Sequence, residues 1–142
     1  YIKLYFERYP RVKAYLDESV ESAKRTGYAV TMFDRRRAMT ELKSSNYNTR
    51  SFGERVAMNM PIQGTAADII KLAMVKVHRI LNERGLKTKL ILQVHDELIF
   101  DTPPDERDEV ALLVHDCMDQ VAQLSVPLDA DVKVGKSWFE TK

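Results

Sequence analysis

Residues 90–100 read LILQVHDELIF, and this stretch decides the fold. Two runs of apolar, strand-forming side chains stand on either side of His95 and Asp96. A separation of two residues is the length of a tight hairpin turn, so the stretch predicts two antiparallel strands within residues 86–101. The turn would carry three neighbouring ionisable side chains, because Glu97 follows Asp96 directly.

Helical patterns precede this hairpin. Residues 2–25 carry apolar side chains at helical spacing, and Pro10 interrupts them at a position that suits the first turn of a second helical segment. Ser51 begins a capping box, a hydroxyl followed three residues later by a carboxylate, and opens a helix expected to run to Gly85. Pro61 lies inside that helix and should kink or split it.

Shorter elements complete the pattern. Residues 28–33 predict a short strand, and the three arginines at residues 35–37 are expected on the following loop. A helix should start within residues 102–106 and carry Cys117 on its core face, and the alternation over residues 128–134 predicts a half-buried strand. The predicted fold class is therefore α+β, with long helices packed on a small antiparallel sheet.

The composition of the 142 residues excludes several classes of protein. A hydrophobic content of 44% excludes a disordered chain, and the single cysteine excludes a disulfide framework. No apolar run approaches the ~20 residues that a membrane helix needs, so we expect no membrane partner and a cytoplasmic location. The chain opens at Tyr1 without a methionine, already inside an apolar run, and we expect a fragment of a larger protein.

The net charge of +1 averages two opposite halves. Residues 1–100 contain 18 Lys and Arg against 11 Asp and Glu, whereas residues 101–142 contain 4 against 10. The first part could face a polyanion, with the acidic end turned elsewhere. The alternative is that both are ordinary solvated surfaces.

The hairpin turn is the first candidate site. A carboxylate on a rigid, apolar-backed turn suits a hard divalent cation, which prefers oxygen ligands. The structural alternative is that Asp96 serves only as a turn residue, since aspartate tolerates left-handed backbone angles. A His-Asp pair also occurs in metal phosphohydrolases, but there it lies on helices with further histidine and aspartate ligands.

A second candidate lies along the long helix. Arg55, Asn59 and Gln63 follow one another in steps of four residues, which keeps them on one helical face. Their side chains are rich in hydrogen-bond donors and can contact the acceptors that all base pairs present in the minor groove. The alternative is that they simply face solvent.

Three motifs resemble family A DNA polymerases. Residues 93–98, QVHDEL, resemble the catalytic hairpin of that family. Residues 54–71 resemble its long palm helix, and residues 135–138, GKSW, are similar to its C-terminal ending. The resemblance covers essentially the whole chain, in the right order and spacing. It implies a lower fingers segment in residues 1–50 and a palm subdomain in residues 51–142, with the hairpin at 86–101 and a helix and strand within 103–138.

The resemblance also implies roles for single residues. Asp96 matches the palm aspartate that ligates catalytic magnesium ions, and Glu97 matches a supporting carboxylate at the same site. Four further residues match positions that contact the primer–template duplex near the primer terminus: Arg55, Asn59, Gln63 and His95. Because that family supplies a second metal-binding aspartate and the nucleotide-binding helix from upstream segments, we expect the fragment alone to be inactive.

The implied reaction is attack of a primer 3′-hydroxyl on the α-phosphorus of a deoxynucleoside triphosphate, with two Mg²⁺ ions. The full-length parent is expected to be a monomer, associated with the nucleoid, that serves replication or repair. A catalytically silent duplex DNA-binding module is the alternative. A metal phosphohydrolase is disfavoured by the absence of further histidine ligands.

Some residues have ambiguous or structural interpretations. The loop at residues 33–41 departs from the family, which often has a glycine at Asp34, so a template role for the arginines stays open. His78 and His115 are expected at the surface, and Cys117 in the core. Trp138 is expected to cover the core.

Overall fold

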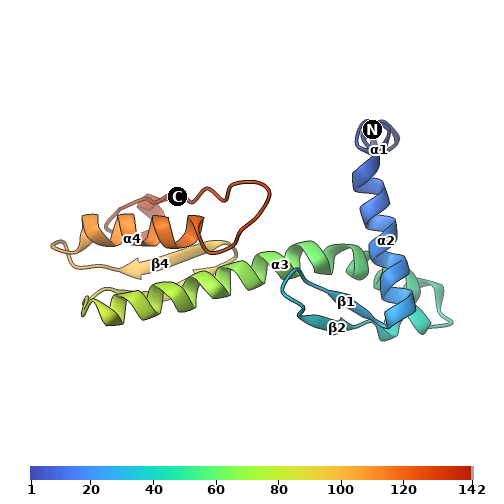
Figure 1. Cartoon of the computed structure of the whole chain (residues 1–142), viewed down its shortest axis with the longest axis horizontal. Coiled ribbons are helices and arrows are strands. Elements are labelled where there is room, and N and C mark those ends of the chain that lie inside the picture. The colour runs from blue at the N-terminus through green and yellow to red at the C-terminus, as the bar shows by residue number, and fades with distance from the viewer. Residues whose placement is uncertain (142) are drawn as a thin grey trace. The chain divides into compact units, whose positions relative to one another are not determined.

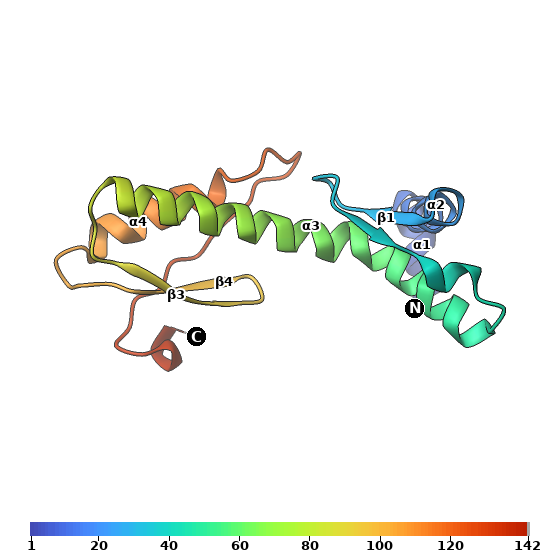
Figure 2. The same ribbon diagram turned by 90° about the horizontal axis from the view of Figure 1, so that it is seen from below.

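The structure is a computed structural model that describes residues 1–141 (Figures 1 and 2). The chain divides into two compact units, Tyr1–Ala66 and the segment from Ala67 onward. Helix α3 (Tyr47–Glu83) contributes its first part to one unit and its second part to the other.

The first unit begins with two helices and a small hairpin. Its elements ahead of α3 are α1 (Ile2–Arg8), α2 (Pro10–Thr26), β1 (Tyr28–Val30), β2 (Arg36–Ala38) and the 3-10 helix η1 (Thr40–Lys43). The predicted interruption at Pro10 is confirmed, since this residue occupies the first turn of α2. Gly27 ends α2 with a left-handed φ of 81°, a conformation that glycine adopts without steric cost.

The region of the three arginines differs from the prediction. Strand β1 pairs antiparallel with β2, with Ala29 opposite Arg37, so two of the three arginines lie in a strand and the predicted loop is wrong. The cause is a tight turn, because the N–H of Thr31 donates to the carbonyl of Arg35 over 3.0 Å. Asp34 takes a φ of 60° inside that turn.

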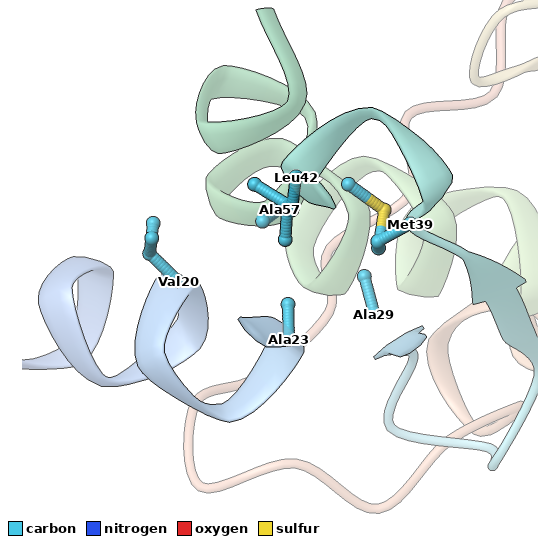
Figure 3. Packing of buried hydrophobic residues seen from close by; sticks show 6 residues of the cluster. All are labelled: Val20, Ala23, Ala29, Met39, Leu42 and Ala57. Carbon is cyan, nitrogen blue, oxygen red and sulfur yellow. The ribbon is translucent and has the colours of Figure 1, made fainter. Parts of the chain in front are cut away.

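The core of the first unit joins its helices to this hairpin (Figure 3). Figure 3 shows six buried side chains that come from α2, β1, η1, α3 and the residue after β2: Val20, Ala23, Ala29, Met39, Leu42 and Ala57. The predicted apolar stripe of α2 is buried only in its C-terminal half, since Val12 remains 39% exposed.

Helix α3 starts earlier than predicted. Its first turn is capped by Asn46, whose Oδ1 accepts from the N–H groups of Asn48 (2.9 Å) and Thr49 (3.3 Å). Ser51 lies inside the helix, so the predicted capping box there is wrong. The helix runs through Pro61 over 37 residues without being split.

The second unit packs a hairpin and a helix around the end of α3. It contains β3 (Lys89–Val94), β4 (Glu97–Asp101), α4 (Arg107–Asp119) and the 3-10 helix η2 (Trp138–Thr141). Buried side chains from α3 and α4 form its core: Val77, Leu81, Val110, Leu113, Val114 and Cys117. Phe100 of β4 packs against this cluster, which seats the hairpin on the two helices. The α+β class is confirmed.

One expectation for the second unit is wrong and two are confirmed. Helix α4 has its N-cap at Glu106, within the predicted residues 102–106. Residues 128–134 form no strand, because no other strand in the described part of the chain pairs with them. Cys117 is buried, as predicted, and burial raises the pKa of its thiol. No helix among the described residues is long and apolar enough to cross a membrane.

Candidate metal-binding hairpin and nucleic-acid interface

The predicted two-residue turn is confirmed. Val94 pairs with Glu97, so only His95 and Asp96 lie between the two strands. His95 adopts a φ of 53°, and its carbonyl accepts a hydrogen bond of 2.6 Å from the side-chain amide of Gln93. The backbone of the turn is therefore held by the Val94–Glu97 pair and by the hydrogen bond from the Gln93 side chain.

The φ angles of the turn residues test whether Asp96 serves only as a turn-forming residue. Asp34 and His95 are the non-glycine residues with positive φ in the described part of the chain, so the left-handed position of the hairpin turn falls on His95 and not on Asp96. Tolerance of left-handed angles therefore does not account for Asp96. Asp96 and Glu97 are both exposed and adjacent in sequence, which places two residues with carboxylate side chains at one end of the hairpin.

The opposite end of the hairpin is anchored by a buried carboxylate. Glu106 accepts hydrogen bonds from the N–H of Lys87 (2.7 Å) and from the N–H (2.9 Å) and hydroxyl (2.7 Å) of Thr88, just before β3. These bonds, the one from Lys87 first, hold the pKa of Glu106 below its ordinary value. The anchor fixes where β3 starts, at the end of the hairpin opposite the turn.

Trp138 begins η2 and remains 39% exposed. Its indole N–H donates to Oε2 of Glu97 over 3.3 Å. Sequence reasoning missed this contact. The only sequence signal near it was the GKSW motif, which by itself names no partner.

The three polar residues of α3 that are predicted to contact DNA form an exposed row, which we call the helix strip. Arg55, Asn59 and Gln63 are all exposed on α3, and the guanidinium of Arg55 donates to the hydroxyl of Ser51 over 3.1 Å. Met58 and Met60, between them in sequence, are half-buried and pack against the core of the first unit. The strip is thus a polar edge on a helix whose other side is anchored.

The hairpin of the first unit is tied to α3 beside this strip. Arg35 donates to the carbonyl of Gly64 over 2.9 Å, and the N–H of Met32 donates to the hydroxyl of Thr65 over 3.0 Å. Arg37 forms an ion pair of 3.2 Å with Glu41. At least two of the three arginines therefore have contacts within the protein.

A second group of ionisable side chains lies on and after α4. Atoms of His115, Asp119 and Asp129 that could ligate a metal lie within 4.8 Å of one another. One oxygen of Asp119 already accepts from the N–H of Ala130 over 2.9 Å, which ties the segment after α4 back to the helix. His115 is half-buried rather than fully at the surface, whereas His78 is exposed as predicted.

Comparisons with known proteins place the chain in a family. The model for DNA polymerase family A matches residues 1–140. DNA polymerase I of Caldicellulosiruptor bescii is 51% identical over 142 residues, which is all of this chain and 17% of that protein. DNA polymerase I of Bacillus subtilis is 49% identical, again over the whole chain and 16% of that protein.

A solved structure agrees with these relatives. The polymerase domain of Pol1 from M. smegmatis, in complex with DNA primer-template and dNTP, superposes with a TM-score of 0.95 at 43% identity. The similarity covers 99% of this chain and 25% of that chain. The chain therefore belongs to DNA polymerase family A, and it spans about a sixth of the length of the curated relatives that it matches.

Proposed function

We propose that this chain is part of a DNA-directed DNA polymerase that adds deoxynucleotides to a primer 3′-hydroxyl. In this proposal residues 1–50 belong to the lower fingers and residues 51–142 to the palm. The observation that carries it is the pair of exposed carboxylates, Asp96 and Glu97, at the end of an anchored hairpin in a family A chain.

Mg²⁺ is the cofactor that we propose for this site. The donor set fits, because two neighbouring carboxylates offer only oxygen ligands, which hard cations prefer. Asp96 would be the metal ligand, and Glu97 a supporting carboxylate at the same site. When bound, the metal would neutralise charge that develops on the reacting phosphate.

The duplex is the second part of the proposal. We assign contacts with primer–template DNA to Arg55, Asn59, Gln63 and His95, all of which are exposed. Amide and guanidinium groups can donate to minor-groove acceptors that every base pair presents, so this grip would not depend on sequence. The M. smegmatis relative carries DNA primer-template and dNTP, which supports the same two partners here.

The isolated chain should not polymerise DNA, because family A polymerases supply a second metal-binding aspartate and the nucleotide-binding helix from segments upstream of the matched region. The full-length protein would act as a monomer in the cytoplasm, associated with the nucleoid. The same proposal gives the full-length protein a role in DNA replication or repair.

Asp96→Asn in the full-length protein tests the metal assignment. Primer extension should fall by roughly three orders of magnitude, because several kcal/mol of charge stabilisation depend on the metal. Binding of a primer–template duplex should persist. Asp101→Asn, the same change at the other end of the hairpin, is the matched control and should extend normally. Near-normal extension by Asp96→Asn would reject the assignment, and a wild-type protein that binds duplex without extending it would favour the silent binding module.

Gln63→Ala tests the helix strip. It should weaken extension and duplex affinity without lowering the melting temperature, because the side chain is exposed. Asn82→Ala removes another exposed amide from α3 and serves as the control. A joint loss of extension and melting temperature in Gln63→Ala would instead indicate a structural role.

A further inference from the structure

The C-terminal segment returns to the hairpin that carries the proposed metal site. Trp138 lies 41 residues after Glu97, yet its indole Nε1–H donates to Oε2 of that carboxylate over 3.3 Å. Figure 2 shows this last segment, in red, close to β3 and β4. The contact joins a residue from the end of the described chain to one of the two carboxylates at the tip.

The segment that presents the indole is braced by its own hydrogen bonds. The carboxylate of Glu140 accepts from the N–H of Lys136 over 2.7 Å, and the N–H of Glu140 donates to the carbonyl of Ser137 over 3.1 Å. The hydroxyl of Thr141 donates to the carbonyl of Trp138 over 2.9 Å. Three bonds within six residues make this a compact turn, so the indole is held from both sides along the chain.

Gly135 is what lets this turn close. A Cβ at this position would lie 2.8 Å from Cβ of Glu140, closer than real Cβ atoms approach, and 3.1 Å from Cγ2 of Thr141, which is a tight contact. The close approach explains, in physical terms, the first residue of the GKSW motif. The GKSW motif thus forms a turn that places Trp138.

Glu97 gains orientation from this contact. Its backbone is fixed opposite Val94 in the first pair of the hairpin, but an exposed glutamate side chain otherwise samples several rotamers. An indole N–H is a donor without acceptor capacity, and an ionised carboxylate is an acceptor, so the two groups are matched. The indole engages one oxygen of the Glu97 carboxylate, Oε2.

We propose that Trp138 is a positioning residue, whose indole N–H holds the Glu97 carboxylate in a fixed orientation at the tip of the hairpin. The inference rests on the proposed polymerase function, because that function gives Glu97 its supporting role. In this role Trp138 acts through Glu97.

A double-mutant cycle in the full-length protein tests this inference. Trp138→Phe keeps an aromatic ring and removes the N–H, and Glu97→Ala removes the acceptor. Trp138→Phe alone should lower kcat for single-nucleotide incorporation about fivefold, the effect of losing one hydrogen bond of about 1 kcal/mol, with KM for the nucleotide and the affinity for duplex unchanged. In the Glu97→Ala background the same change should have no further effect.

Hydrogen exchange of the metal-free protein gives a readout independent of activity. Amides of residues 94–98 should exchange several-fold faster in Trp138→Phe, and equally fast in Glu97→Ala and in the double variant. Phe139→Ala, which removes the neighbouring side chain that is 87% exposed, is the control and should change neither measurement.

The outcomes separate the inference from the proposed function. If the wild-type protein extends primers but Trp138→Phe matches it in kcat and exchange, the positioning role is rejected and the polymerase proposal stands. An equal loss of kcat with and without Glu97 would also reject the role, since it would show an effect that does not pass through that carboxylate. If the wild-type protein fails to extend primers, the proposed function fails, and exchange alone decides whether Trp138 orders the tip.

Discussion

Gly64→Ala sets two opposing effects against each other in the middle of α3. Alanine is better than glycine inside a helix by about 1 kcal/mol, so propensity alone predicts a more stable protein. A Cβ at this position, however, would lie 2.7 Å from Cγ2 of Thr31 and 3.0 Å from Sδ of Met60. Contacts this short require a neighbour to move, and the sign of the change depends on which neighbour can do so.

The two neighbours differ in their freedom. The thioether of Met60 ends a flexible side chain and can shift at little cost. Thr31 is buried, and its hydroxyl accepts from the N–H groups of Phe33 (3.3 Å) and Arg35 (3.2 Å). Rotation of Thr31 would break both bonds in the turn between β1 and β2. Overpacking at a site that cannot yield costs roughly 1–3 kcal/mol, so the steric effect exceeds the gain in propensity.

We therefore expect Gly64→Ala to destabilise this region by about 1 kcal/mol net, a rise of about fivefold in the local opening constant. Native-state hydrogen exchange of the full-length protein over residues 28–38 and 60–66 measures this directly. Ala66→Gly, at an exposed position of the same helix, calibrates the propensity term and should cost about 1 kcal/mol.

Thr31→Ser gives the decisive comparison, because it removes Cγ2 and keeps the hydroxyl. In that background Gly64→Ala should become stabilising, since the closest steric contact is gone. Slower exchange in Gly64→Ala with Thr31 intact would refute the reasoning, because it would show that the turn yields without cost.

Three further outcomes follow from named contacts. Asn46→Ala should destabilise the start of α3 by about 1 kcal/mol in hydrogen exchange, whereas Ser51→Ala should cost much less, because the first residue caps the helix and the second lies within it. The pKa of Glu106 is held below its ordinary value of 4.5, so its stabilisation is complete above that value and is lost as the pH falls through the lowered pKa; melting temperatures of Glu106→Gln and wild type should differ at neutral pH and converge in acid. Burial raises the pKa of Cys117, so its thiol should react slowly with a thiol reagent at pH 8 and rapidly after denaturation.

The β3–β4 hairpin could be predicted almost to the residue because its determinants are local. Two apolar runs separated by two residues leave one register for the turn, and the structure has it, with Val94 opposite Glu97. The interruption at Pro10 and the end of α2 at Gly27 are local in the same sense, since each depends on the backbone chemistry of one residue.

The start of α3 and the arginine segment differ from the sequence prediction because local signals compete there. Ser51 with Glu54 and Asn46 with its following amides are both valid capping patterns, and only the packing of α3 decides which one is used. Residues 35–37 carry no strand signal of their own. Arg36 and Arg37 become extended because β1 needs a partner and a turn at Asp34 returns the chain to it.

Residues 128–134 have a strand pattern but form no strand, which again shows that a local pattern alone does not determine the structure. The alternation of apolar and charged residues there is a period-2 pattern, but a strand exists only where another backbone accepts its hydrogen bonds. In the described part of the chain β3 pairs with β4 and β1 with β2. A sequence pattern can thus state what a segment is suited for, and pairing decides whether it becomes that element.

The candidate metal site depends on local sequence for the identity of its carboxylates and on distant residues for their orientation. Only the identity can be predicted from the sequence. The identity of its donors is local: two neighbouring carboxylates beside a tight turn suggest a hard cation, and the left-handed angle at His95 removes the simplest structural reason for Asp96. The orientation of those donors is not local. Glu97 is held by an indole 41 residues away, and the start of β3 is held by Glu106 from the residue before α4. Because both holds come from segments that follow the hairpin in sequence, the chain after Asp101 contributes to the site without supplying a ligand. A truncation there would leave every proposed ligand in place and still remove what positions them.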